Sequence, residues 1–314
     1  MNVLLNLELN DRQVQQIRSV SSDVELMRLQ SEGEILEAMP DVQIVFGDLS
    51  EEMFAQASSL RWVQATGAGV DSRLFPDLVE SDVVLTSAKG TVGVHLAEHA
   101  MALLLGLTRG IATAVRNPSW AQRMPIRNAT WELADRTMGI VGLGGTGRDL
   151  ADRAHGFGMR IVAVDPEDVE VPDHVEACWK MDRLYELLEQ SDVVAICAPL
   201  TPETNGMFDG HAFARMRNHA LLINVTRGKI VNERALLDAL RNGVIGGAGL
   251  DVTPQEPLPG DHPLWRMENV IVTPHAAGGS PNREDRIVEL FCENLRRLLD
   301  GQPLLSVIDK RKGY

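Results

Sequence analysis

The stretch Met138–Asp165, MGIVGLGGTGRDLADRAHGFGMRIVAVD, determines the fold that the sequence predicts. An apolar run at Gly139–Leu143 is typical of a buried parallel strand, and from Gly142 onward three glycines stand in the order G-x-G-x-x-G. A helix with one apolar face is predicted over Thr146–Phe157, and a second strand is predicted over Arg160–Val164. Strand, loop, helix and strand make one βαβ unit of a doubly wound α/β sheet.

Three glycines and one aspartate predict that this unit binds a dinucleotide. Gly142 permits a tight turn, Gly144 lets a pyrophosphate approach the backbone, and Gly147 lets the helix pack close to the strand. The N-terminus of the helix favours an anion through its unpaired N–H groups and its dipole. Asp165 ends the next strand, where a carboxylate can accept hydrogen bonds from a ribose. We expect NAD rather than NADP, because no Lys or Arg follows Asp165 before Lys180.

Charge and cysteine content argue against several classes of protein. The 314 residues include 30 Lys plus Arg and 44 Asp plus Glu, which gives a net charge of −14 and disfavours nucleic acid and anionic membranes as partners. The cysteines Cys178, Cys197 and Cys292 lie far apart, so we expect reduced thiols and no metal site. Without a signal-peptide pattern or an apolar run near about 20 residues, the protein is expected to be cytoplasmic.

Short apolar runs that alternate with helical stretches predict two parallel α/β layers. Besides the two strands above, strands are predicted over Val3–Leu7, Val24–Leu29, Val42–Phe46, Trp62–Ala65, Val83–Leu85, Val193–Cys197, Leu221–Val225, Gly246–Leu250 and Val270–Val272. Helices are predicted over Asp11–Val20, Ser31–Ala38, Val94–Leu107, Asp182–Glu189, Asn232–Arg241 and Pro281–Leu299. The second layer then has six or seven strands.

One long polar segment, Arg116–Trp131, is predicted to be a connection without regular structure. Loops of this length in compact proteins are usually functional or extend over a neighbouring chain. We favour an interface arm, and together with the apolar helix Val94–Leu107 it predicts a two-fold homodimer. The alternative, that Trp120, Arg123 or Arg127 lines a substrate pocket, stays open.

The chemically active residues are expected at the carboxyl ends of the strands, where parallel sheets bind ligands. His275 follows a strand, and it is a candidate acid because histidine as a residue type titrates in the physiological range. Glu256 precedes it by 19 residues and would favour the charged imidazole and fix its tautomer. Arg227 has the fork geometry that binds a carboxylate. Asp251 either faces the cofactor or caps a loop. Each residue also has an interpretation without a catalytic role: His275 as a structural histidine, Glu256 as a solvated loop charge and Arg227 as part of a surface salt bridge.

Several motifs together resemble those of the D-isomer-specific 2-hydroxyacid dehydrogenases. The matching stretches are the loop Gly67–Asp71, Ala97-Glu98-His99-Ala100, GLGGTG at 142–147, Cys197-Ala198-Pro199-Leu200-Thr201, Asn224-Val225-Thr226-Arg227-Gly228, Asp251-Val252 with Glu256-Pro257, and Thr273-Pro274-His275. The resemblance covers nearly the whole chain. It implies a Rossmann nucleotide domain over 94–282, inserted in a smaller flavodoxin-like substrate domain made of 1–93 and 283–314, with the active site in the cleft.

The resemblance also implies a role for each residue of the site. The catalytic residues would be Arg227, Glu256 and His275, and the substrate carboxylate would lie on the amides of Ala68, Gly69 and Val70 and on Arg227. Further cofactor contacts are implied for Gly145, Thr146, Pro199, Thr204, Val225, Asp251, His275 and Gly278.

The predicted reaction is hydride transfer between NADH and a small 2-oxo acid to give a D-2-hydroxy acid, with hydroxypyruvate or glyoxylate as the expected substrate. The alternative is a nicotinamide-sensing interaction protein similar to the corepressors of the same family.

Overall fold

The computed structural model describes all 314 residues, and its contacts divide them into two compact units. The first unit contains Met1–Val92 and Ser280–Tyr314, and the second contains Gly93–Gly279. Both ends of the chain therefore build the first unit, and one uninterrupted segment builds the second. None of the helices combines the length and the apolar character that crossing a lipid bilayer requires.

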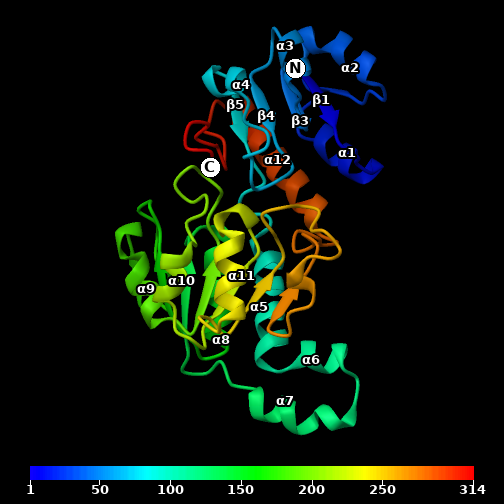
Figure 1. Cartoon of the computed structure of the whole chain (residues 1–314). Helices are drawn as coiled ribbons and strands as arrows, with labels where there is room; N and C mark the ends of the chain where they lie inside the picture. Colours follow the sequence, from blue (N-terminus) through cyan, green and yellow to red (C-terminus); the bar gives the residue numbers. More distant parts are fainter. The chain divides into compact units, whose positions relative to one another are not determined.

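The first unit is a five-stranded parallel sheet in the order β2-β1-β3-β4-β5. Four of these strands, β1, β3, β4 and β5, are labelled in Figure 1. Its strands are β1 (Asn2–Asn6), β2 (Glu25–Met27), β3 (Ile44–Gly47), β4 (Trp62–Gln64) and β5 (Val84–Thr86). One face packs against α1 (Asp11–Arg18) and α12 (Arg283–Leu299), and the other packs against α2 (Glu32–Ala38), α3 (Glu51–Gln56) and α4 (Pro76–Glu80). Phe291 of α12 stacks on Phe46 at 4.2 Å and on Trp62 at 5.1 Å between ring centroids. The C-terminal helix thus completes a core that begins with β1.

Local sequence explains where the first helices begin. The Asn10 side chain accepts from the backbone N–H of Gln13 and the Gln13 side chain accepts from the Asn10 backbone, which is a capping box at the start of α1. Ser31 and Glu34 form the same arrangement at α2. Asn10 is thus the N-cap of α1.

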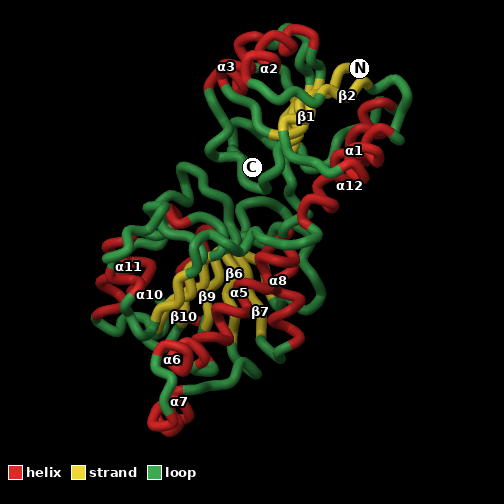
Figure 2. Tube along the Cα trace, turned by 90° about the vertical axis from the view of Figure 1, so that its right-hand side faces the viewer, coloured by secondary structure: helices red, strands yellow, loops and turns green.

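The second unit is a seven-stranded parallel sheet in the order β12-β11-β10-β9-β6-β7-β8. Its strands are β6 (Thr137–Val141), β7 (Arg160–Val164), β8 (Ala177–Trp179), β9 (Val193–Ile196), β10 (Leu221–Asn224), β11 (Gly247–Leu250) and β12 (Val270–Val272). Figure 2 shows β10, β9, β6 and β7 side by side. The chain reverses its direction of travel across the sheet between β6 and β9, and such a switch point is where doubly wound sheets bind ligands. The expected doubly wound fold is confirmed.

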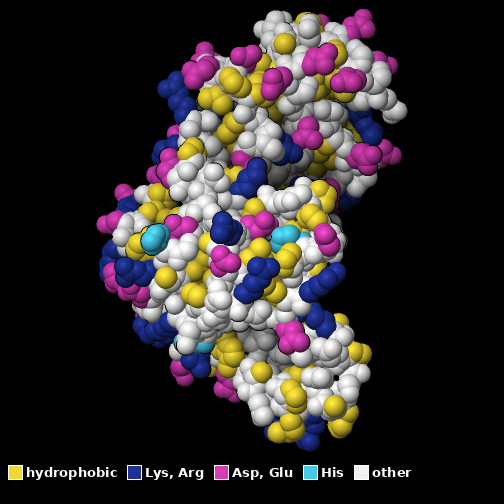
Figure 3. All heavy atoms as spheres, viewed as in Figure 1, with side chains coloured by type: hydrophobic (Ala, Val, Ile, Leu, Met, Phe, Trp, Pro, Cys, Tyr) yellow, Lys and Arg dark blue, Asp and Glu magenta, His cyan; other side chains and the backbone are white.

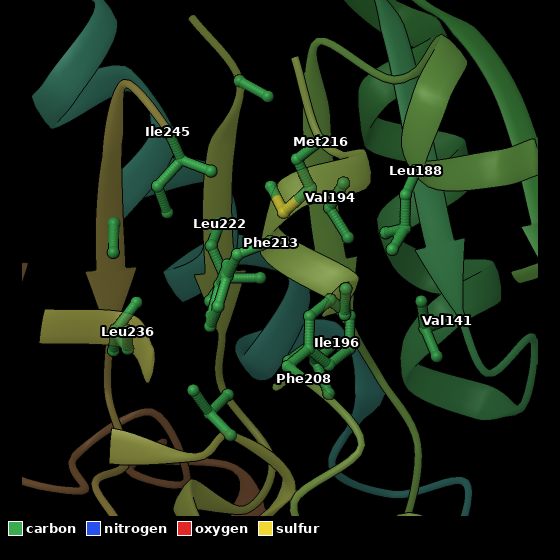
Figure 4. Close-up of a cluster of buried hydrophobic side chains, with 14 of the residues drawn as sticks. Val141, Leu188, Val194, Ile196, Phe208, Phe213, Met216, Leu222, Leu236 and Ile245 are labelled. Atoms are coloured by element: carbon green, nitrogen blue, oxygen red, sulfur yellow. The ribbon is translucent and has the colours of Figure 1, made fainter. Parts of the chain in front are cut away.

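Helices cover both faces of this sheet. One face packs against α9 (Leu184–Gln190), α10 (Gly210–Arg215) and α11 (Glu233–Arg241), and the other packs against α5 (Gly93–Thr108) and α8 (Gly145–Gly156). Figure 4 shows the first of these cores, in which Val141, Val194, Ile196 and Leu222 of the strands meet Leu188, Phe213 and Leu236 of the helices. Strands that are buried on both faces explain the continuous apolar runs of the sequence.

A buried carboxylate ties three strands together at the end of the sheet where they begin. Asp192 accepts hydrogen bonds from the Thr137 backbone N–H at 2.8 Å, Arg217 Nη1 at 2.9 Å and His219 Nε2 at 2.7 Å. Burial alone raises the pKa of Asp192, but the bonds from His219, Thr137 and Arg217 outweigh it and lower that pKa. The ionised form of Asp192 therefore stabilises the start of β6, β9 and β10.

The segment Arg116–Trp131 is not the irregular connection that its polar composition predicts. Most of it is helical: α6 (Ile111–Arg116) is followed by a short turn and by α7 (Arg123–Ala129), and the two form an arm that extends from α5 (Figure 1). Pro125 lies in the first turn of α7, where its missing N–H breaks no helical hydrogen bond. Pro125 is therefore compatible with the helix.

Candidate active site

The glycine-rich loop after β6 has the shape that a pyrophosphate requires. Gly142 has φ +95°, and a Cβ there would lie 2.8 Å from the backbone nitrogen of Ala198. Gly144 is the N-cap of α8 without a side-chain hydrogen bond to the helix, and a Cβ at Gly144 would meet no atom within 4 Å. A ligand in that space would meet the first N–H groups of α8, which belong to Gly145, Thr146 and Gly147. These residues fit the phosphates of a dinucleotide.

Asp165 lies at the end of β7 and contacts the glycine-rich loop directly. Its Oδ2 accepts from the backbone N–H of Leu143 at 2.8 Å, and its Oδ1 accepts from that of Glu167 at 2.9 Å. Asp165 is 8% exposed and Leu143 is fully buried. Each carboxylate oxygen keeps a second lone pair that can accept from a ribose hydroxyl. Asp165 therefore organises the loop as well as presenting a negative charge.

The loop that follows Asp165 is acidic, and the first lysine or arginine after it, Lys180, is already engaged. Lys180 donates to Asp168 at 2.6 Å and to the carbonyl oxygen of Pro166 at 3.2 Å. The bond from Lys180 lowers the pKa of Asp168. Arg148 of helix α8 is paired with a carboxylate of the same loop, since its Nη1 lies 3.9 Å from Glu170 Oε2. A further phosphate group at this end of β7 would thus approach mainly carboxylates.

The other residues assigned to the cofactor lie at the carboxyl ends of neighbouring strands. Pro199 comes shortly after β9, Val225 directly follows β10, and Gly278 lies in the segment after β12. The Thr204 hydroxyl donates to the carbonyl oxygen of Pro199 at 2.8 Å, which closes the loop after β9. Burial raises the pKa of the nearby Cys197 thiol to about 12, so this cysteine is no nucleophile at neutral pH.

His275 and Glu256 form the pair that their sequence separation suggested. His275 Nδ1 lies 2.8 Å from Glu256 Oε2, and the side chains are 51% and 39% exposed. The other carboxylate oxygen, Oε1, accepts from the Thr253 backbone N–H at 3.0 Å and so fixes the orientation of Glu256. With Nδ1 directed at the carboxylate, Nε2 is the ring nitrogen available to a substrate.

Arg227 follows β10, and Asp251 and His275 follow the next two strands of the sheet. The backbone carbonyl oxygen of Arg227 accepts from Asn224 Nδ2 at 2.9 Å. The guanidinium of Arg227 donates through Nη1 to the Thr226 carbonyl oxygen at 2.8 Å. The three expected residues therefore lie at the ends of three adjacent strands of one unit.

Asp251 is the buried centre of this group. Its side chain is 0% exposed; Oδ1 accepts from Thr273 Oγ1 at 2.6 Å and from the Ala276 N–H at 2.8 Å, and Oδ2 accepts from the Ala277 N–H at 2.9 Å. The Asp251 carbonyl oxygen also accepts from the His275 N–H at 2.8 Å. His275 has φ +51°, a conformation that costs a non-glycine residue about 1–3 kcal/mol and that only strong surroundings maintain. Asp251 supplies those surroundings.

In the first unit, the loop after β4 offers unpaired backbone N–H groups. Those of Ala68, Gly69 and Val70 donate to no acceptor of the protein. Arg283 Nη2 donates to the Thr66 carbonyl oxygen at 2.8 Å. The Arg73 side chain packs against the loop, because a Cβ added at Gly67 would lie 3.3 Å from Arg73 Nη1. Arg73 is itself held by an ion pair with Asp48 at 2.8 Å. A loop held from both sides with free N–H groups can bind an anion.

Sequence reasoning assigned no role to two residues that the structure brings to the site. His99 Nε2 lies 2.8 Å from Thr273 Oγ1 and 3.4 Å from Asp251 Oδ1. Both residues belong to stretches that match the family, but no role could be assigned to them from the sequence, because only the packing of α5 on the sheet reveals this contact.

The sequence predicted no metal site and left open whether Trp120, Arg123 or Arg127 lines a substrate pocket. No group of three or more His, Cys, Asp or Glu side chains is arranged to hold a metal ion. Trp120 is 88% exposed, and Arg123 and Arg127 are also exposed, all on the α6–α7 arm. Figure 3 shows hydrophobic side chains gathered on the lobe at the lower end of the view that this arm forms.

Comparison with known proteins gives consistent results. Residues 101–277 match the family described as D-isomer specific 2-hydroxyacid dehydrogenase, NAD binding domain. The chain is 37% identical over 268 residues to a glyoxylate reductase of Korarchaeum cryptofilum, covering 83% of this chain and 80% of that one. It is also 37% identical over 258 residues to an (S)-sulfolactate dehydrogenase of Chromohalobacter salexigens, covering 80% and 81% of the two chains.

A solved structure extends the similarity to nearly the full length. It is a D-isomer specific 2-hydroxyacid dehydrogenase from Xanthobacter autotrophicus in complex with NADPH and MES, with 30% identity, a TM-score of 0.82 and coverage of 100% of this chain and 99% of that one.

Proposed function

Since the chain belongs to the D-isomer specific 2-hydroxyacid dehydrogenases, a family of oxidoreductases, we propose that it reduces a small 2-oxo acid to a D-2-hydroxy acid with NADH. The observation that carries the proposal is the His275–Glu256 pair at 2.8 Å, at the end of the same sheet that presents the glycine-rich loop. Hydroxypyruvate or glyoxylate is the substrate we favour, and the glyoxylate reductase among the relatives supports that choice.

Each residue of the pair has one task in this reaction. Nε2 of protonated His275 donates a proton to the oxygen of the carbonyl as that oxygen becomes an alkoxide, and Glu256 holds the ring by Nδ1. Arg227 binds the substrate carboxylate and polarises the carbonyl. Bound NADH supplies the hydride, and the protein supplies orientation and electrostatics. The amides of Ala68, Gly69 and Val70 are proposed as further ligands of the carboxylate.

The choice of NADH rests on Asp165 and the acidic loop after it. The Asp165 carboxylate lies at the end of β7, where a ribose hydroxyl can donate to it but a phosphate would be repelled. The bond from Lys180 to Asp168 removes the one lysine that could offset this repulsion. The similar Xanthobacter enzyme was solved with NADPH, so the proposal of NADH for this chain depends on Asp165 and its acidic surroundings.

We further propose a homodimer in which the α6–α7 arm contacts a second copy of the chain. Ile111, Val115, Trp120 and Met124 of the arm are 54%, 74%, 88% and 52% exposed. An isolated group of exposed apolar residues of this kind is typical of an interface.

Steady-state assays of NADH oxidation over a panel of 2-oxo acids test the proposed activity. His275→Ala should lower kcat about 10²- to 10⁴-fold for the best substrate and leave the Kd for NADH nearly unchanged. His211→Ala, a change at an exposed histidine of α10, is the matched control and should retain activity. NADH binding without turnover of any 2-oxo acid would instead favour a nicotinamide-sensing interaction protein.

A further inference from the structure

A chain of hydrogen bonds links helix α5 to the catalytic histidine. It runs from His99 on α5 to Thr273 after β12, from Thr273 to Asp251 after β11, and from Asp251 to the backbone of residues 275–277. His275 lies in that last segment and has φ +51°. The link therefore connects a side chain on a helix to the backbone that sets the direction of the proposed acid.

Close packing of α5 on the sheet explains why His99 reaches this point. His99, Leu103 and Gly106 are spaced by four and three residues, so they share one face of the helix. A Cβ at Gly249 of β11 would lie 2.8 Å from Leu103 Cβ, and one at Gly106 would lie 2.7 Å from Ile271 of β12. These two glycines allow the helix to approach both strands, and the next position on the same face is His99.

The direction of each bond follows from the number of protons available. The Thr273 hydroxyl has one proton, and at 2.6 Å it is donated to Asp251 Oδ1, which has none to give when ionised. The Thr273 oxygen must then accept, so Nε2 of His99 carries a proton and donates it over 2.8 Å. His99 is thus a donor that fixes Thr273, and Thr273 is a donor that fixes Asp251.

We propose that His99 and Thr273 are positioning residues of the active site, which hold Asp251 and through it the segment that carries His275. This inference rests on the proposed function, because it assigns His275 as the acid. In this role, His99 and Thr273 act through Asp251 rather than on the substrate. Their effect is on geometry, and a displacement of a catalytic group by about 1 Å can lower the rate about 10²-fold.

Paired substitutions separate this role from a general contribution to stability. Thr273→Val and His99→Leu remove the donors, whereas Thr273→Ser and His99→Gln keep one. We expect the first two to lower kcat about 10- to 100-fold with the Kd for NADH changed less than about threefold. The conservative pair should recover kcat to within about threefold of the unmodified protein.

His219→Leu is the matched control. It removes a histidine bond to a buried aspartate, Asp192, in the same unit but at the opposite ends of the strands. It should reduce stability and leave kcat within about twofold. The proposal is overturned if Thr273→Val and His99→Leu behave like this control, or if the conservative variants are as impaired as the apolar ones. Should His99→Leu not fold, the Thr273→Val and Thr273→Ser pair decides alone.

A second measurement does not depend on turnover. In protein labelled with ¹⁵N-histidine, the ring signals of His275, assigned with His275→Ala, should move in Thr273→Val and stay in place in Thr273→Ser and His219→Leu. Unmoved signals in Thr273→Val would contradict the link. If no 2-oxo acid is turned over but the signals move as expected, the proposed function fails and the positioning of His275 stands.

Discussion

Replacing Asp165 by asparagine should change the cofactor preference and the stability of the second unit together. Asparagine keeps the size of the side chain and removes its charge. In the structure, one oxygen of Asp165 accepts from the buried N–H of Leu143 and the other accepts from the N–H of Glu167. An amide has a single acceptor oxygen, so one of these N–H groups loses its partner.

The size of both effects follows from this geometry. A carboxylate about 5 Å from a doubly charged phosphate at a partly exposed site repels it by about 2–4 kcal/mol, which is about 30- to 1,000-fold in Kd. The Kd ratio of NADPH to NADH should therefore fall by a factor in this range in Asp165→Asn. A lost bond to a buried N–H costs about 1–3 kcal/mol, which for a domain of this size lowers Tm by about 2–12 °C.

Titration calorimetry with NADH and NADPH, and thermal unfolding followed by circular dichroism, measure the two effects. Glu170→Gln is the control, because Glu170 belongs to the same loop and its side chain is 91% exposed. It should change the Kd ratio less than about threefold and leave Tm nearly unchanged. Equal affinity of the unmodified protein for NADH and NADPH would refute the assignment of Asp165, and an unchanged Tm in Asp165→Asn would refute its role in the loop.

Three further predictions concern stability, assembly and substrate binding. Because folding lowers the pKa of Asp192, the contribution of its carboxylate to stability is present above about pH 4 and is lost as the pH falls through the lowered pKa. Asp192→Asn should therefore lower the free energy of unfolding in urea by about 2–3 kcal/mol at pH 7, and this loss should become smaller in acid. A loss that stays constant down to pH 3 would contradict the prediction. Light scattering should give a dimer mass at micromolar protein and a monomer mass for Trp120→Glu; a monomeric unmodified protein would contradict the arm interface. Arg283→Met removes the bond to the Thr66 carbonyl oxygen and should raise KM for the 2-oxo acid several-fold without changing the Kd for NADH; an unchanged KM would show that the loop does not depend on it.

Much of the second unit could be predicted because its strands are buried on both faces. The run predicted at Arg160–Val164 matches β7, and the run predicted at Val193–Cys197 exceeds β9 by one residue. Continuous apolar runs with glycine at their ends leave few alternatives. The positions of His275 and Arg227 could then be predicted from the strands, because parallel sheets bind ligands at the carboxyl ends of their strands.

Other features depend on tertiary packing and have no local pattern. The edge strand β8 (Ala177–Trp179) is three residues long and half-buried throughout, so it shows neither an apolar run nor alternation. Helix α7 has no buried residue and so lacks the apolar face that marks a helix in a sequence, and the polar composition of this segment suggested a loop. The bond from His99 to Thr273 joins residues 174 positions apart and arises from the packing of α5 on the sheet.

The division of the first unit between the two ends of the chain has a consequence for synthesis on the ribosome. Phe46 and Trp62 are made early, but Phe291, on which both stack, is made only after the whole of Gly93–Gly279. At about 5–20 residues per second, this intervening segment takes roughly 10–40 s to translate. During that interval the apolar face of β1, β3 and β4 lacks α12, while the second unit can already fold. The nascent chain thus exposes its first-made strands longest, and we expect chaperone binding to concentrate there.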